Sequence, residues 1–158
     1  FEMMHVVLVE PEIPGNTGNI ARLCAATGAS LHLVRPLGFS VDDRYLKRAG
    51  LDYWHLVDIH YYDSVEEVLA AYPDSPRFLL TTHAHKSYSR VHYGPDSLLI
   101  FGKESAGLPE SFRLAHAEEC VRIPMVSEAR SLNLANSVSI VLYEALRQND
   151  FDLQEGTI

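Results

Sequence analysis

The sequence predicts an α/β fold, with a mainly parallel sheet and helices on both of its faces. Short apolar runs alternate with amphipathic stretches along the 158 residues, and no linker interrupts them. This alternation is typical of strand–helix–strand units, whose strands run parallel. Irregular segments rich in Gly, Pro, Ser and Asn follow three of the apolar runs, at 11–19, 102–109 and 124–133. Because ligands of such sheets bind beyond the carboxyl ends of the strands, we expect the three segments to share one site.

The first half of the chain is predicted to contain three strands and three helices. The strands are expected at 5–9, 30–34 and 55–61, and the helices from about residue 18 to 27, over 42–50 and over 64–72. Gly28 ends the first helix, whose apolar face is expected to carry Ile20, Leu23, Cys24 and Thr27. Asp42 or Asp43 caps the second helix, and the third opens with the capping box formed by Ser64 and Glu67.

The second half is predicted to contain three further strands and the longest helix. The strands are expected at 77–82, 97–101 and 120–124, and the first two are apolar enough to be central in the sheet. The helix over 132–148 carries a wide apolar stripe of Leu134, Val138, Val141, Leu142, Ala145 and Leu146. A stripe of this width has room to cover both the sheet and a second protein chain.

Length and composition indicate one globular domain, which we place at 4–150. Residues 1–3, ahead of Met4, look like a remnant of cloning, and 151–158 are expected to form a C-terminal tail. The composition, with 47% hydrophobic and 22% charged residues, is ordinary, and no apolar run reaches the roughly 18–20 residues of a membrane span. No segment has the pattern of a signal peptide. Since Cys24 and Cys120 are the two cysteines and lie far apart, we expect a reduced, cytoplasmic protein without a membrane segment.

The formal net charge of −8 argues against a protein that coats nucleic acid in general. One local basic face is predicted, because Arg44, Lys47 and Arg48 stand at i, i+3 and i+4 of the helix over 42–50. Taken alone, this face is an ordinary solvated surface. It nevertheless leaves local recognition of RNA open.

Several familiar motifs are excluded by their spacing. "GNTGNIA" lacks the G-x-G-x-x-G spacing of a dinucleotide site. "LIFGKESAG" is not a Walker A loop, because Ser97 stands where the first glycine belongs and Glu104 follows the lysine; it also lacks the first glycine of a nucleophile elbow. His83 and His85 would share one face of a strand, but without a third ligand a polar loop is expected and not a metal site. From these residues alone, the chain is a nucleotide-binding α/β protein of open chemistry.

Three long segments resemble, in order and spacing, the three motifs of the SPOUT methyltransferases. They are "PEIPGNTGNIARLCAATG", "LLIFGKESAGLP" and "VRIPMVSEARSLNLANSVSIVLYEALRQ". The similarity covers residues 4–149, includes "PLGF" and "DDRYLKRAGLDYWHL", and is strongest to the small single-domain enzymes that methylate the 2′-hydroxyl of the tRNA wobble nucleotide.

The resemblance implies a deep trefoil knot in the C-terminal part, whose loops hold S-adenosylmethionine in a bent shape. Chemistry agrees at two positions, because Gly102 lets the backbone approach a ligand and Pro124 leaves the backbone of Ile123 extended. For Leu80 and Ile123 a plainer alternative stays open. Their side chains belong to the core in that case, and only their backbone groups bind the cofactor. No metal is needed, because the sulfonium is already an activated methyl donor. The cofactor residues implied are Leu80, Gly102, Glu104, Ile123, Met125, Ser131, Leu132 and Asn133.

Arg22 and Arg130 are the implied catalytic residues. Arg22 lies opposite the apolar face of its helix and does not belong to the core. The resemblance places it at the 2′-hydroxyl, where two roles stay open. A general base is demanding for a side chain whose pKa exceeds about 12, whereas a bidentate phosphate clamp is chemically easier. Arg130, beside the cofactor turn, is expected to hold a phosphate or the ribose; a plain surface arginine is the minor alternative for both.

The resemblance also implies two partners, a second copy of the chain and the anticodon stem-loop of tRNA. In the homodimer the first and last helices pack across the two-fold axis, and Arg22 acts on the cofactor of the other chain. Asn16 and Asn19 order their loop or donate hydrogen bonds to the nucleotide. The residues expected to contact RNA are Asn16, Asn19, Arg44, Lys47 and Arg48.

The function expected from the resemblance is S-adenosylmethionine-dependent 2′-O-methylation of cytidine or uridine at position 34 of tRNA. Two alternatives stay open: methylation of another tRNA position or of rRNA, and a non-catalytic RNA-binding knot protein. The chain departs from the family at Lys103 and Ala106, where "KESAG" replaces the frequent "PETRG", and in the loop 83–91. These departures bear on substrate preference more than on cofactor binding.

Overall fold

The computed structural model describes residues 2–153, without the side chains of residues 47 and 49–52. The described residues form one sheet of six parallel strands in the order β3-β2-β1-β5-β4-β6. The strands are β1 (His5–Val9), β2 (Ser30–Val34), β3 (Ile59–Tyr62), β4 (Arg77–Leu80), β5 (Leu98–Phe101) and β6 (Cys120–Val121). The predicted α/β class with a parallel sheet is confirmed. The trefoil knot stays a prediction.

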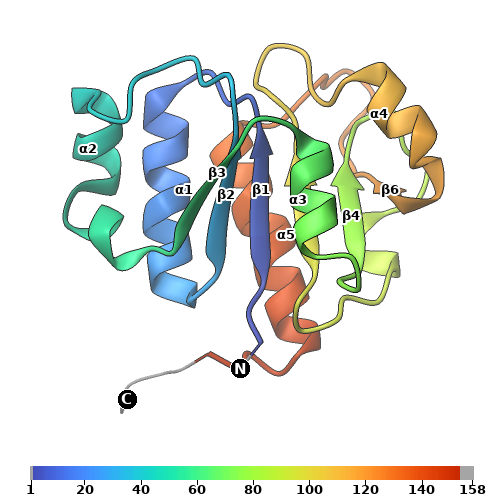
Figure 1. Ribbon diagram of the computed structural model, residues 1–158. Coiled ribbons are helices and arrows are strands. Elements are labelled where there is room, and N and C mark those ends of the chain that lie inside the picture. The colour runs from blue at the N-terminus through green and yellow to red at the C-terminus, as the bar shows by residue number, and fades with distance from the viewer. Residues whose placement is uncertain (1, 154–158) are drawn as a thin grey trace.

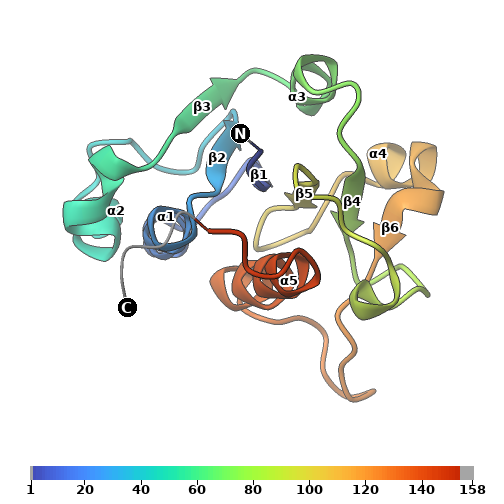
Figure 2. The same ribbon diagram turned by 90° about the horizontal axis from the view of Figure 1, so that it is seen from below.

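Helices cover both faces of this sheet (Figures 1 and 2). They are α1 (Pro14–Thr27), α2 (Arg44–Gly50), α3 (Val65–Ala71), α4 (Glu110–Ala115) and α5 (Leu134–Gln148). Viewed from below in Figure 2, α1 and α5 lie on one side of the strands, whereas α3 and α4 lie on the other. α2 packs beside α1, away from α5, and continues into the 3-10 helix η1 (Leu51–Leu56).

Each face of the sheet buries its own apolar cluster. Val6 and Leu8 of β1 belong to the cluster under α1 and α5, whereas Val7 and Val9 belong to the cluster under α3 and α4. All five residues of β1 are therefore buried, which is typical of a central strand in a parallel sheet. Burial of each such aliphatic side chain stabilises the fold by about 1.5–3 kcal/mol. The six residues of the predicted stripe on α5 are all buried as well.

α1 begins at Pro14, four residues before the predicted start near Gly18. Proline is favoured in the first turn, because its missing N–H would lack an intrahelical partner there. Gly28 ends the helix as predicted, with a positive φ of 76° that suits glycine. On the predicted apolar face, Ile20 is buried, but Leu23 is only half-buried. The N-cap residue of α1, Ile13, offers no side-chain cap, so that local signal for a helix start is missing here.

Other boundaries also differ from the predictions. The predicted strand at 55–61 starts only at Ile59, because η1 takes up the residues up to Leu56. β4 and β6 are shorter than predicted, and the turn 110–115 forms α4, which was not predicted. Asp43 accepts the N–H groups at the start of α2, and Ser64 accepts from Glu67 at the start of α3. The Glu67 carboxylate accepts from the N–H of Asp63 and so completes the capping box one residue earlier than predicted.

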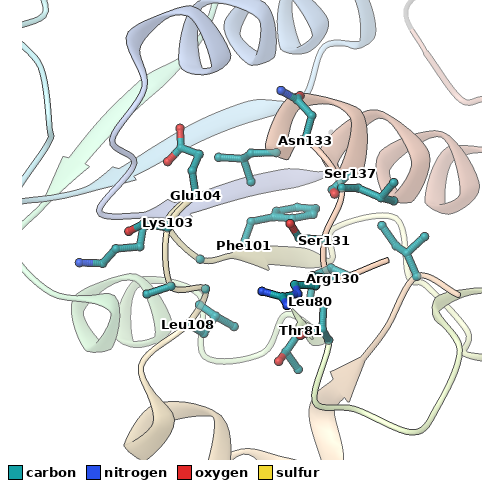
Figure 3. A pocket seen from close by; sticks show the side chains of 18 of the residues that line it. Leu80, Thr81, Phe101, Lys103, Glu104, Leu108, Arg130, Ser131, Asn133 and Ser137 are labelled. Atoms are coloured by element: carbon teal, nitrogen blue, oxygen red, sulfur yellow. The ribbon is translucent and has the colours of Figure 1, made fainter. Parts of the chain in front are cut away.

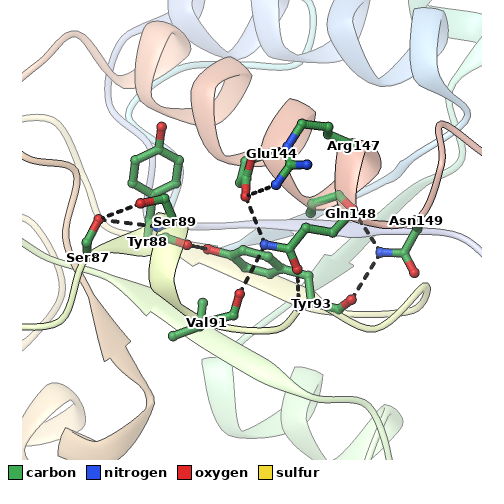
Figure 4. A network of polar contacts seen from close by, with 10 residues as sticks. Ser87, Tyr88, Ser89, Val91, Tyr93, Glu144, Arg147, Gln148 and Asn149 are labelled. Carbon is green, nitrogen blue, oxygen red and sulfur yellow. Dashed lines mark hydrogen bonds and ion pairs between the residues drawn. The ribbon is translucent and has the colours of Figure 1, made fainter.

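The loop between β4 and β5 is fastened to the end of α5 by side-chain amides (Figure 4). Gln148 accepts from the backbone N–H of Tyr93 at 2.9 Å and donates to the carbonyl of Val91 at 3.0 Å. Asn149 donates to the carbonyl of Tyr93 at 3.0 Å, and the Tyr93 hydroxyl donates to the carbonyl of Tyr88 at 2.7 Å. These bonds satisfy partly buried backbone groups of the loop, and they hold the loop against the helix.

Candidate functional site

A pocket of about 620 Å³ opens at the carboxyl ends of β4, β5 and β6. Its volume lies within the range of small-molecule sites, roughly 300–1,000 Å³. Residues on both sides of it come from the starts of α1 and α5. Figure 3 shows Phe101 in the middle of the lining, with Glu104 and Asn133 on one side and Arg130 and Thr81 on the other. The three irregular segments predicted to share one site therefore do meet, at 13–16, 102–108 and 123–133.

The loop after β5 forms one wall and depends on Gly102. A Cβ at this position would lie 2.1 Å from the carbonyl carbon of Gly107 and 2.2 Å from the nitrogen of Leu108. The loop folds back on itself, and Gly107 donates to the carbonyl of Lys103 at 2.9 Å. The prediction that glycine is required at 102 thus has a different physical reason. The close neighbour is the protein's own backbone, and any larger residue would displace the wall of the pocket.

Glu104 joins this loop to the start of α1. Its carboxylate accepts from the backbone N–H groups of Glu12 at 2.8 Å and Ile13 at 2.9 Å, and from the side-chain amide of Asn16 at 3.2 Å. Ile13 is the N-cap residue of α1 and offers no side-chain cap. The Glu104 carboxylate therefore supplies the negative charge and the acceptors that a helix start favours.

A second bond strengthens the same junction. Glu12 accepts from the backbone N–H of Ser105 at 2.8 Å, and hydrogen bonding from Ser105 holds the pKa of Glu12 below its usual value. Each segment thus offers a carboxylate to the backbone of the other. The two loops form one unit beside the pocket.

Asn133 attaches the third segment. Its side-chain oxygen accepts from the N–H of Asn136 at 3.1 Å, as an N-cap of α5, and its amide donates to the side-chain oxygen of Asn16 at 3.1 Å. Asn16 is buried and bridges Glu104 and Asn133, because its amide donates to Glu104 and its side-chain oxygen accepts from Asn133. This places Asn16 in the role of ordering the loop, which was one of its two predicted roles.

All eight predicted cofactor residues line the pocket, and so do Asn16 and Arg130. Binding of S-adenosylmethionine by these residues stays a prediction. Sequence reasoning missed several further lining residues, among them Thr81, Thr82, His83, Phe101, Lys103, Leu108 and Ser137. Thr81 follows the end of β4 directly, and Ser137 lies one turn after Asn133 on α5. Each of these two residues lies next to a predicted residue, along the chain or one helical turn away. This proximity is the signal that could have identified them.

Lys103 adds a positive charge at the pocket wall. Its ammonium lies 3.7 Å from a carboxylate oxygen of Glu10, and both side chains are about one-third exposed. Glu10 directly follows β1 and has a positive φ of 56°, an uncommon backbone conformation for a residue other than glycine. Arg130 and His83 also belong to the lining, so three of the side chains there carry basic nitrogen groups.

The remaining predicted residues lie outside this pocket. Arg22 is exposed on α1, with its Cζ 5.0 Å from the ring centroid of Tyr53. Arg44 lies over the ring of Tyr45 on α2 and donates to its hydroxyl at 3.0 Å. Asn19 and Arg48 are exposed on α1 and α2, and the side chain of Lys47 lies outside the described part of the structure. Of the predicted RNA-binding residues with described side chains, the structure therefore brings Asn16 to the pocket of the same chain and leaves Asn19, Arg44 and Arg48 outside it.

Other reactive groups do not form a second centre in the described residues. Burial raises the pKa of the Cys24 thiol to about 12, which fits the buried apolar role predicted for it. Within residues 2–153, no three His, Cys, Asp or Glu side chains are grouped in a way that could hold a metal ion. Among the same residues, no helix combines the length and apolarity that crossing a membrane requires.

Residues 3–143 match the model of the SpoU rRNA Methylase family. A protein of Bacillus subtilis (strain 168), named as a candidate tRNA (cytidine(34)-2'-O)-methyltransferase, is 50% identical over 151 residues, which cover 94% of each chain. A protein of Methylovorus glucosotrophus named tRNA (cytidine(34)-2'-O)-methyltransferase is 48% identical over 150 residues, covering 94% of this chain and 97% of that protein.

Solved structures show the same similarity. One, described as "Structural insights into the 2-OH methylation of C/U34 on tRNA", is 44% identical with a TM-score of 0.88 and covers 94% of this chain and 97% of its own. The SpoU methyltransferase AviRb of Streptomyces viridochromogenes, in complex with the cofactor AdoMet, is 29% identical with a TM-score of 0.81. The match covers 94% of this chain and 58% of AviRb.

Proposed function

Since the chain belongs to the SpoU rRNA Methylase family, we propose that it methylates the 2′-hydroxyl of cytidine or uridine at position 34 of tRNA, with S-adenosylmethionine as donor. The names of two relatives at 48–50% identity and the subject of a solved structure at 44% identity support this substrate. The observation that carries the proposal is the pocket itself. It is assembled from the three segments that carry the resemblance. Hydrogen bonds from Asn16 to Glu104 and from Asn133 to Asn16 join these segments.

The pocket residues fit the proposed cofactor. Leu80, Ile123 and Leu132 offer apolar side chains, which suit an adenine ring, and Ser131 offers a hydroxyl. The complex of the relative AviRb with AdoMet supports the same choice. When bound, the cofactor supplies a methyl group on a positively charged sulfur. The chain's own residues must hold the ribose beside it and manage the proton of the hydroxyl.

A 2′-hydroxyl is a very weak acid, so alignment of its oxygen is the first requirement. Alignment alone can supply several kcal/mol of the barrier reduction. Arg130 lies in the pocket lining, which supports the proposal that it holds the ribose or its phosphate. Arg22 is assigned the second contact, either as a bidentate phosphate clamp or as the group that accepts the proton. Both roles need a guanidinium that is held in place.

Arg22 does not line the pocket of its own chain, so we propose that it serves the pocket of a second copy in a homodimer. Three exposed apolar side chains support an interface that includes α1 and α5. Ile13 is 48% exposed at the start of α1, and Leu132 and Tyr143 are 38% and 42% exposed at the start and on the outer face of α5. Interfaces are enriched in such residues at their centre. Arg44 and Arg48 on α2 then supply further contacts to the anticodon stem-loop, in the cytoplasm.

A defined tRNA substrate tests the proposal. We expect the purified protein to incorporate one methyl group into a tRNA with cytidine or uridine at position 34, as found by nuclease digestion and mass spectrometry. The same tRNA with 2′-deoxycytidine at position 34 is the matched control, because it lacks only the accepting oxygen. Methylation of the deoxy control would place the target elsewhere. Methylation of rRNA and not of tRNA would support the rRNA alternative that the family description names.

A further inference from the structure

Arg22 is held by the face of an aromatic ring. Its Cζ lies 5.0 Å from the ring centroid of Tyr53, within the roughly 6 Å over which a guanidinium is attracted to an aromatic face. In the described part of the chain, no ion pair of Arg22 with a carboxylate accompanies this contact. Arg77 and Arg147 differ, because each forms an ion pair, with Glu119 and Glu144 respectively.

The kind of contact decides which donors remain available. Arg147 uses Nε and Nη2 for the two carboxylate oxygens of Glu144, at 2.9 and 3.0 Å. A ring face attracts the charge of a guanidinium and uses none of its five N–H donors for a carboxylate oxygen. Arg22 is thereby fixed in position while its fork stays open for a phosphate or a ribose oxygen.

Tyr53 is itself supported by its neighbours in sequence. It belongs to η1, which packs against α1 directly after α2. The next residue, Trp54, packs against the apolar cluster under α1. Since Trp54 holds η1 to the core, the ring of Tyr53 is presented to α1 by a fastened segment. Tyr53 is 36% exposed as a residue, and Arg22 is exposed as well, so the pair stays accessible from solvent.

We infer that Tyr53 is a positioning residue for Arg22: its ring fixes the guanidinium and leaves the hydrogen-bond donors free for the nucleotide. The inference rests on the proposed function, because it assigns Arg22 to the methyl-transfer step. Tyr53 acts through Arg22 and is not itself required to touch the substrate. A phenylalanine keeps the ring and should therefore replace Tyr53 without loss of this positioning role.

The test compares Tyr53→Leu with Tyr53→Phe in the chain of 158 residues, on the tRNA described above. We expect Tyr53→Leu to lower kcat about two- to fivefold, the size of an exposed cation–π contact, with unchanged affinity for S-adenosylmethionine. Tyr53→Phe should keep the wild-type kcat. The matched control is Tyr61→Leu, since Tyr61 is 37% exposed and lies under Arg35 at 5.1 Å, which also pairs with Asp63. We expect this control to keep the wild-type kcat.

Two further measurements separate positioning from folding. In an Arg22→Ala background, Tyr53→Leu should cause no additional loss of kcat, because the group that it positions is gone. In NMR spectra of the wild type, the ring current of Tyr53 should shift the Arg22 side-chain protons upfield, and Tyr53→Leu should abolish the shift. The inference about Tyr53 would be overturned by equal kcat in wild type and Tyr53→Leu. It would also be overturned if the losses of kcat from Tyr53→Leu and Arg22→Ala were fully additive. Neither result would contradict the proposed function. A wild type that binds tRNA but methylates no position would overturn the proposed function, and the inference with it.

Discussion

The side-chain amide of Asn133 donates a hydrogen bond of 3.1 Å to the side-chain oxygen of Asn16, although 117 positions separate them in the chain. Asn133 caps α5 with its oxygen, and Asn16 donates to Glu104 with its own amide. One pair of amides thus connects the starts of two helices and the loop after β5. The shape of the pocket depends on this connection.

Replacement of Asn133 separates its two roles. Asn133→Asp keeps an oxygen for the cap of α5 but lacks the donor to Asn16, so we expect near wild-type stability with weaker cofactor binding. Asn133→Ala loses both and should also lower the free energy of unfolding by about 1 kcal/mol. Urea unfolding and calorimetry with S-adenosylmethionine measure the two effects. Ser64→Ala, which removes the cap of α3, is the control that should cost stability and leave cofactor affinity unchanged.

Glu104→Gln should destabilise the start of α1. The glutamine keeps one acceptor for the three donors that now converge on the carboxylate, and it loses the charge that favours the helix start. We expect a loss of about 1–3 kcal/mol in the free energy of unfolding and a weaker affinity for the cofactor. Glu110→Gln removes an exposed carboxylate 4.0 Å from Arg113 and serves as control. Equal stability of both variants would show that the carboxylate of Glu104 does not hold α1.

Gly102→Ala should weaken cofactor binding strongly. The added Cβ would meet the backbone at Gly107 and Leu108 at 2.1–2.2 Å, so the wall of the pocket must move. Gly15→Ala is the matched control, because a Cβ there meets nothing within 4 Å and alanine favours the helix. Calorimetric titration with S-adenosylmethionine should show wild-type affinity for Gly15→Ala only. An unaffected Gly102→Ala would mean that this loop does not shape the binding site.

Arg22→Ala should leave stability and cofactor affinity near the wild-type values, because the side chain is exposed and outside the pocket of its chain. Methyl transfer to tRNA should fall by orders of magnitude. Arg22→Lys keeps the charge but not the planar fork, and a loss of kcat with unchanged tRNA affinity would favour positioning or proton removal at the hydroxyl. Wild-type turnover of Arg22→Ala would transfer the role to Arg130. Arg35→Ala is the exposed-arginine control.

Stability should fall below about pH 6.5 because of two buried imidazoles. Nδ1 of His5 lies 3.0 Å from Nε2 of His32, and Ser30 bonds to both. Burial lowers the pKa of His5 and lowers that of His32 to about 3. The pKa of an imidazole in the unfolded chain is near 6.5. Between about pH 3 and pH 6.5, His32 therefore binds a proton in the unfolded chain but not in the folded chain. The stabilisation is therefore complete above about pH 6.5 and is lost as the pH falls.

Denaturant unfolding at pH 7 and pH 5 checks this expectation. His32 alone should account for roughly 2 kcal/mol of the difference, at about 1.4 kcal/mol per pH unit below 6.5. A His32→Asn variant should show a correspondingly flatter dependence on pH. A His60→Asn variant is the control, since His60 is half-exposed and stacks on His32 at 5.1 Å without a hydrogen bond to it. An equally steep dependence in His32→Asn would contradict the assignment.

Local patterns in the sequence determined most of the secondary structure and the location of the site. Apolar runs predicted the five longer strands, and Gly28 and Ser64 marked a helix end and a helix start where the structure has them. These signals succeed because their physics acts within a few residues: a positive φ at one glycine, or one hydroxyl that accepts an N–H three positions away. The three irregular segments likewise predicted the pocket, because parallel strands bring their carboxyl ends to one edge.

Only the tertiary structure decided how those parts are held together. At the start of α1, Ile13 donates to Glu104, which lies 91 positions away, and the guanidinium of Arg22 lies over the ring of Tyr53 in η1. The requirement for glycine at 102 arises from the backbone of its own loop and not from a ligand. None of these contacts has a local signature, because each joins groups that become neighbours only after the sheet has formed. Periodicity can place a residue on a face, but the partner that it meets there is set by the packing of distant segments.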